Sequence, residues 1–211
     1  MKDFLDRLKE IFRGQKIYYL LVLLLFCMGV VIGVYTVKYM DERNKSDLIS
    51  YFGNFTNSMG ERNVDYWELF SITLKKNLFL IIPILILGFT FWGSFIILII
   101  DLVKGFSLGY TFAFLISTFE GKGLVLALAS IVPQNIVYIP CFIALSVIGI
   151  YFSANSFKER FSKKNALSRF ELLKEFKNIV FVILVFFSFG LIIETYICPN
   201  LIKFVISNFY V

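Results

Sequence analysis

Histidine is absent from this chain of 211 residues, and cysteine and proline are scarce, with three and four residues. Cys27, Cys141 and Cys198 lie far apart within apolar stretches, so they form neither a metal-ligand spacing nor a disulfide framework. Free cysteines of this kind are typical of a protein core or a lipid-facing surface. Without a ligand cluster, or a nucleophile beside a base, the sequence predicts no metal site, no cofactor and no enzyme activity.

Charged residues are also few, at 17% of the chain, whereas hydrophobic residues make up 58%. This composition lies well to the apolar side of a soluble domain, so lipid is the expected solvent. No charged or Pro/Ser-rich linker divides the chain, and we predict a single membrane domain over residues 1–211. The formal net charge is +6, but the cations flank apolar runs rather than forming a basic patch. We therefore assign them to membrane topology and expect no nucleic-acid partner.

Five apolar runs predict an all-α fold, a polytopic transmembrane bundle of about five spans in contact with membrane lipid. The predicted spans cover residues 17–37, 78–100, 105–119, 124–152 and 179–198. Asp101 and Lys104 are assigned to a short turn between the second and third spans. Asp65 is a predicted N-cap ahead of the second span.

Three further segments flank these spans. Residues 1–16 have an apolar and a charged face and are predicted to form an interfacial amphipathic helix. Residues 38–77 are a polar loop, part of which is expected on the membrane surface, and 199–211 are an interfacial tail. Lys and Arg number 13 on the side of the N-terminus and 8 on the other. Because cytoplasmic segments carry the excess of cations, we predict a cytoplasmic N-terminus and an extracytoplasmic 38–77 loop and C-terminus.

The fourth span carries Pro133, Gln134 and Asn135 at its middle, and Pro140 follows seven residues after Pro133. Each proline removes a backbone donor, so freed carbonyls and two side-chain amides gather near the bilayer centre. Two interpretations remain open. The span is either a kinked helix whose amides hydrogen-bond to neighbouring spans, or a broken helix that binds a ligand or acts as a hinge.

Two other features of the spans have competing interpretations. Gly105 and Gly109 form a small-xxx-small pair, which serves either intramolecular packing or self-association into a homo-oligomer. Glu194 is interpreted as the single acid inside an apolar run. It is either a functional group at membrane depth or, because it lies near Pro199, a residue that reaches interfacial water.

The sequence resembles the stage II sporulation protein M family, integral membrane proteins of endospore-forming bacteria. The resembling elements are Lys104-Gly105-Phe106-Ser107-Leu108-Gly109-Tyr110, Ala129-Ser130-Ile131-Val132-Pro133-Gln134-Asn135 with Ile139-Pro140, and Glu194-x-Tyr196-x-x-Pro199 followed by Leu201 and Lys203. The resemblance covers nearly the whole chain in the same order of spans. Tyr138 stands where the family pattern has an aliphatic residue, and the first loop matches only in length and general character.

This resemblance implies a multi-pass protein of the bacterial cell membrane, placed in the mother-cell engulfing (septal) membrane during sporulation. Its implied role is a scaffold that recruits and localises two peptidoglycan-degrading partners, stage II sporulation proteins D and P, for forespore engulfment. Because interfaces draw on aromatic residues and Arg, we expect docking through exposed residues of the 38–77 loop. These are Tyr51, Phe52, Phe55, Glu61 and Arg62.

A competing hypothesis is a permease-like subunit of a membrane transporter, in which the fourth span and Glu194 line a substrate path. Two features of the sequence count against it. The two halves of the chain show no inverted-repeat similarity, and buried charges are scarce.

Overall fold

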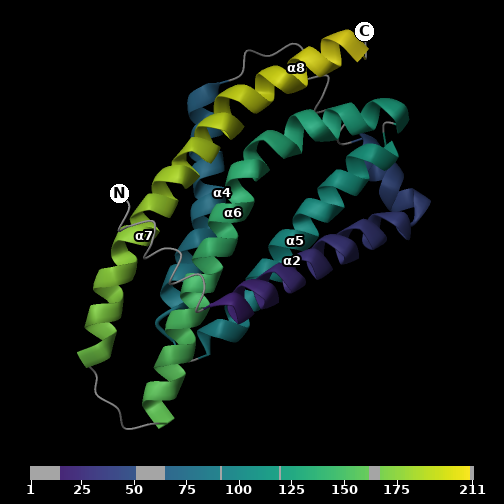
Figure 1. The fold of residues 1–211 in the computed structure, drawn as a ribbon. Coiled ribbons are helices and arrows are strands. Elements are labelled where there is room, and N and C mark those ends of the chain that lie inside the picture. The colour runs from purple at the N-terminus through teal and green to yellow at the C-terminus, as the bar shows by residue number, and fades with distance from the viewer. Residues whose placement is uncertain (1–14, 51–64, 91, 119, 162–166, 210–211) are drawn as a thin grey trace.

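A computed structural model shows the chain as a bundle of long helices (Figure 1) and describes residues 15–50, 65–90, 92–118, 120–161 and 167–209. The helices are α2 (Lys16–Lys38), α4 (Tyr66–Leu87), α5 (Gly93–Thr118), α6 (Glu120–Phe161), α7 (Leu167–Ile192) and α8 (Cys198–Phe209), and the π-helix η1 (Ile193–Ile197) joins α7 to α8. Residues 42–50 are also helical, and the described residues contain no strand. The predicted all-α fold is confirmed.

Among the residues that the structure describes, five helical segments are long and apolar enough to cross a membrane. They are Lys16–Lys38, Tyr66–Leu87, Gly93–Thr118, Gly123–Asn155 and Ile179–Val205. The predicted number of spans is therefore confirmed. Successive spans alternate in direction (Figure 1), as expected of a chain that crosses a bilayer five times.

The predicted boundary between the second and third spans is wrong. Helix α4 ends at Leu87 and α5 begins at Gly93, and α5 runs without interruption through Asp101 and Lys104, which were assigned to the turn. The predicted second span, 78–100, thus joins the end of α4 to the beginning of α5. Charged residues are typical of a turn between spans, but here they lie inside a helix because other helices surround them.

The start of α4 explains this shift. Asp65 is the N-cap of α4, as predicted, and its carboxylate accepts hydrogen bonds from the backbone N–H groups of Trp67 (2.9 Å) and Glu68 (3.2 Å). The helix therefore begins at Tyr66, and residues 66–77 of the predicted loop belong to the second span. At a rise of about 1.5 Å per residue, a helix that starts there has crossed the apolar layer near Leu87.

The new boundaries change the count of cations on the two sides. Lys75 and Lys76 move from the outer loop into α4, Lys104 moves from the inner turn into α5, and Lys203 lies within the fifth span, Ile179–Val205. Removing these four residues lowers the inner count from 13 to 12 and the outer count from 8 to 5. The excess of cations on the side of the N-terminus grows, which supports the predicted orientation.

This orientation is tested by reporter fusions. A reporter that is active only outside the cytoplasm should be active when it is fused after Val211 and inactive when it is fused before Met1, because five spans place the two ends on opposite sides. A reporter that is active only in the cytoplasm serves as the matched control. If that second reporter works at both ends, the odd number of spans is wrong.

The C-terminal end of the chain can be compared with its prediction, whereas most of the N-terminal segment cannot. The fifth span was expected to end at Cys198, but α8 continues it and the apolar segment extends to Val205. Residues 199–209 are thus a helix continuous with the span rather than a separate tail. The predicted interfacial helix at 1–16 lies outside the described residues except for its last two.

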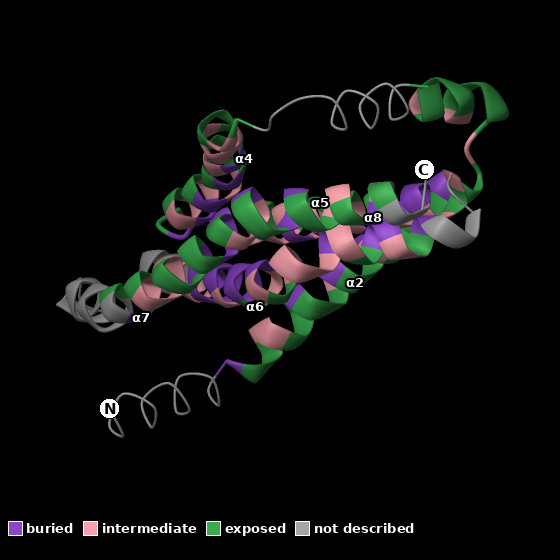
Figure 2. Cartoon of the chain, turned by 90° about the horizontal axis from the view of Figure 1, so that it is seen from above, coloured by how far each residue is buried: buried purple, intermediate pink, exposed green. Residues whose placement is uncertain are grey.

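Helix α6 is the central element of the bundle. Within its most apolar window 67% of the residues are buried, against 22–28% in the other four spans, and it packs against α2, α4, α5, α7 and α8. Seen from above, its buried surface lies between these helices (Figure 2). Pro133 and Pro140 both lie inside α6, which remains helical and bends along its length (Figure 1). The structure therefore shows a bent helix that is not broken at either proline.

Helices α2 and α5 pack through glycine on both sides. A Cβ atom added to Gly105 or Gly109 would lie 2.2 Å from a carbonyl oxygen of α2, and one added to Gly29 or Gly33 would lie 2.1 or 2.3 Å from a carbonyl oxygen of α5. Contacts this short exist only because these residues have no side chain, so the two backbones touch directly. The Gly105/Gly109 pair therefore serves intramolecular packing.

Candidate functional site

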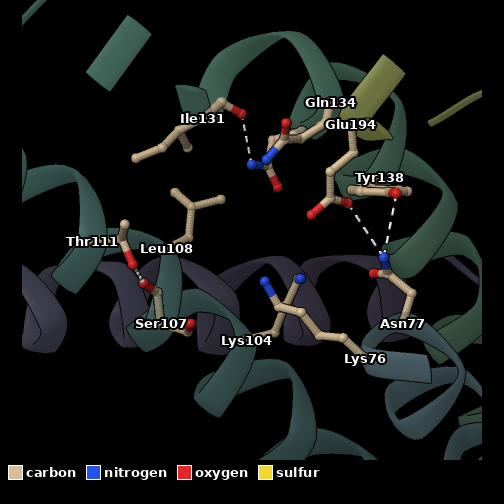
Figure 3. A pocket seen from close by; sticks show the side chains of 11 residues that line it. Lys76, Asn77, Lys104, Ser107, Leu108, Thr111, Ile131, Gln134, Tyr138 and Glu194 are labelled. Atoms are coloured by element: carbon tan, nitrogen blue, oxygen red, sulfur yellow. Dashed lines mark hydrogen bonds between the residues drawn. The ribbon is translucent and has the colours of Figure 1, made fainter. Parts of the chain in front are cut away.

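A polar cavity of about 100 Å³ lies between helices of the bundle (Figure 3). Four helices line it: α4, α5, α6 and the π-helix η1. The lining includes Gln134 and Asn135, the two amides of the fourth span, and Glu194. The structure thus brings together two sequence elements that lie about 60 residues apart in the chain.

Three charged side chains point into this cavity: Lys76 of α4, Lys104 of α5 and Glu194 of η1 (Figure 3). Lys76 is exposed, and the other two are partly buried. The cavity therefore holds two ammonium groups and one carboxylate at membrane depth, where ionisable residues are costly and usually functional.

Asn77 connects three elements at one side of the cavity. Its amide nitrogen lies within hydrogen-bond distance of three acceptors, the Tyr138 hydroxyl (3.3 Å), Glu194 Oε2 (3.3 Å) and the backbone carbonyl of Thr73 (3.0 Å), which share its two hydrogens. Tyr138 is also stacked on Phe187, with ring centroids 4.6 Å apart. These contacts hold α4, α6 and η1 together and fix the direction of the Glu194 carboxylate.

Sequence reasoning did not find Asn77, Lys76 or Lys104 as site residues, because it placed them in a loop or a turn. Tyr138 was noticed only as a departure from the family pattern. One signal could have revealed Asn77 and Lys76. Counting helical turns from the Asp65 N-cap places both three turns into the helix, well inside the bilayer.

The two amides of α6 behave differently. Gln134 Oε1 accepts a hydrogen bond of 2.7 Å from the Cys198 thiol of α8, which confirms the predicted interhelical bond for this residue. Asn135 Nδ2 donates instead to the carbonyl of Ile131 in its own helix, at 2.7 Å. The hydrogen bond recorded for the Asn135 side chain thus lies within α6, and the residue lines the cavity.

Glu194 lies on η1, one turn before Pro199. In this π-turn the backbone N–H of Cys198 bonds to the carbonyl of Ile193, five residues back, which widens the helix. Single π-turns within α-helices are frequent at functional sites. Here the widened turn carries Glu194 toward Asn77 and the cavity, rather than toward interfacial water.

A second polar contact lies one turn from Lys104. The Asp101 side chain is 0% exposed, and one of its oxygens accepts a hydrogen bond of 2.6 Å from the Ser146 hydroxyl of α6. Its other oxygen, Oδ2, is buried without a hydrogen-bond partner among the described residues. Glu194 is therefore not the single acid inside a span. Among the described residues Asp101 is the one residue of a charged type that is buried, since Lys76 is exposed and Lys104 and Glu194 are partly buried, so buried charges are scarce, as the sequence indicated.

Other predicted site features lie elsewhere. The five candidate docking residues fall within 51–64, outside the described residues. The three cysteines are free, with Cys27 exposed and Cys141 and Cys198 buried. Across the described ranges, no group of three or more His, Cys, Asp or Glu side chains could hold a metal ion.

The helices and the cavity define a class: a polytopic helical membrane protein with a charged polar site between its spans. Residues 22–199 match the family of stage II sporulation protein M, and the chain belongs to that family. It is thus a sporulation-related, multi-pass membrane protein. No curated protein and no solved structure matches the chain significantly.

Proposed function

We propose that this protein is a membrane scaffold that recruits and localises peptidoglycan-degrading enzymes, stage II sporulation proteins D and P, in the engulfing septal membrane of the mother cell. The observation that carries the proposal is family membership over residues 22–199. The engulfment role and the partners come from the resemblance to that family. In this role the protein positions other enzymes and carries out no reaction of its own.

The segment between α2 and α4 is the proposed docking region. In its described part, residues 42–50 form a mostly exposed helical stretch that carries charges of both signs. In the predicted orientation this segment faces the cell wall, where wall-degrading enzymes act. A scaffold needs an accessible polar surface of this kind, because its spans are surrounded by lipid.

The test replaces residues 45–64 with a Gly/Ser linker of equal length. Asp65 is retained because it caps α4. The linker keeps the reach of the loop while removing its side chains, so recovery of both enzymes in a detergent co-purification should fall about tenfold or more. The matched control is the same linker with Tyr51, Phe52, Phe55, Glu61 and Arg62 restored at their positions, which should regain recovery.

Wild-type recovery with the plain linker would show that docking occurs elsewhere and would refute the loop assignment. The purified protein should leave peptidoglycan intact in the same buffers. Cleavage by the protein without its partners would refute the scaffold role itself.

A permease-like subunit remains the second candidate, and the charged cavity beside the kinked α6 favours it. The scaffold and the permease-like subunit differ in which proteins should co-purify with this protein from detergent. A soluble ATPase in place of wall-degrading enzymes would support transport.

A further inference from the structure

We propose that the cavity between α4, α5, α6 and η1 binds an oxyanion, in the form of a phosphate group that is either free or part of a lipid headgroup. This inference concerns the cavity alone and does not rest on the scaffold role. It follows from the charge, the hydrogen-bond donors, the size and the access of the site.

The net positive charge of the cavity favours the binding of an anion. Lys76 and Lys104 both direct their ammonium groups into it, and Glu194 supplies only one negative charge (Figure 3). The Glu194 carboxylate already accepts a hydrogen bond from Asn77. A bound anion would neutralise the excess positive charge at membrane depth, where an uncompensated charge is unfavourable.

The donors of the cavity suit an oxyanion better than a bare halide. Besides the two ammonium groups, the Ser107 hydroxyl and the Gln134 amide line it. Because Gln134 accepts the Cys198 thiol hydrogen through Oε1, its amide nitrogen is left to donate toward the cavity. Several donors around one space match the several acceptor oxygens of a phosphate, and lysine is a common phosphate ligand.

Size and access also favour this ligand. A volume of about 100 Å³ has room for a few groups of the size of a water molecule, whereas a drug-sized ligand needs about 300 Å³ or more. Lys76, Ser107 and Thr111 are exposed, so the cavity opens on the side where α4 and α5 face each other. A small solute or a lipid headgroup can enter there.

The test measures binding to the full-length protein in uncharged detergent. Inorganic phosphate is titrated by calorimetry, and phosphatidylglycerol is scored by native mass spectrometry. We expect at least one of these probes to bind to the wild-type protein. Lys76→Gln and Lys104→Gln should each weaken the binding of that probe about tenfold or more, because each substitution removes a charged donor. Lys75→Gln is the matched control, since Lys75 neighbours Lys76 on α4 and does not line the cavity, and it should stay within about twofold of the wild type.

Glu194→Gln should change the affinity for the anion in the opposite direction. It removes the competing carboxylate while keeping an oxygen that can accept from Asn77, so binding should strengthen about fivefold. Damage to the fold would weaken binding, so a gain separates the site from a structural effect. Binding of phosphate points to a free anion, and binding of phosphatidylglycerol alone points to a headgroup. The proposal is overturned if neither probe binds, if Lys75→Gln weakens binding as much as Lys76→Gln, or if Glu194→Gln fails to strengthen it.

Discussion

Gly105→Ala should lower the free energy of unfolding by about 3 kcal/mol or more, the upper end of the cost of overpacking. The added methyl group would lie 2.2 Å from the carbonyl oxygen of Phe26. Since that oxygen belongs to the backbone of α2, the strain cannot be relieved by turning a side chain. The two helices must move apart, and the reciprocal contacts at Gly29 and Gly33 are lost with them. Unfolding in mixed detergent and SDS, followed by circular dichroism, measures the change.

Val103→Ala is the matched control for this variant. Val103 lies two residues away on α5 and is 51% exposed, so its truncation should change the free energy of unfolding by no more than about 0.5 kcal/mol. Equal stability of Gly105→Ala and the wild type would contradict the packing of α2 on α5. A change in oligomeric state without a change in stability would instead favour the self-association interpretation of this glycine pair.

Ser146→Ala should destabilise the protein by about 1–3 kcal/mol, although it removes a single oxygen atom. The Ser146 hydroxyl gives Asp101 the one hydrogen bond that its side chain has among the described residues. Without it, a fully buried carboxyl group loses its partner. The same unfolding assay applies, and Ser188→Ala is the control because Ser188 is exposed and bonds only to a carbonyl of its own helix.

The double variant Asp101→Leu/Ser146→Ala should recover the lost stability. Leucine has nearly the shape of aspartate, and replacing both members of a buried polar pair by apolar groups is often neutral or stabilising. If the double variant is less stable than Ser146→Ala alone, the carboxyl of Asp101 has a further stabilising contact. If it is stable but inactive in sporulation, Asp101 serves function rather than folding.

Several residues of charged types lie within the spans and bear on the function of the protein. Lys76, Asp101, Lys104 and Glu194 all lie within spans, and three of them line one cavity. Such residues are costly in lipid and need partners or a ligand. A scaffold that only displays a docking loop has no evident need of them, so the cavity points to a second property of the same protein.

Part of the candidate site could be predicted from the sequence. Pro133, Gln134 and Asn135 stand out because they lie at the centre of an apolar run. The backbone carbonyl freed by a proline and the side-chain amides must find hydrogen-bond partners within the protein there. Glu194 stands out for the same reason. Lys76 could have been placed inside the span by counting helical turns from the Asp65 N-cap. Lys104 could not be distinguished from a turn residue, because a charge beside an apolar run predicts a helix end unless other helices cover it.

The sequence by itself determined the helical class, the number of spans and the family. These follow from properties local to each segment: the length of an apolar run, and the requirement that every backbone group in lipid bonds within its own helix. Only the tertiary structure decided where the second span ends, which amide bonds to another helix, and which charges share a cavity. Asn77 and Glu194 are 117 residues apart, and their contact depends on how α4 packs beside the π-turn of another span. A pairing across that distance is set by the shapes of whole helices, and no local pattern encodes it.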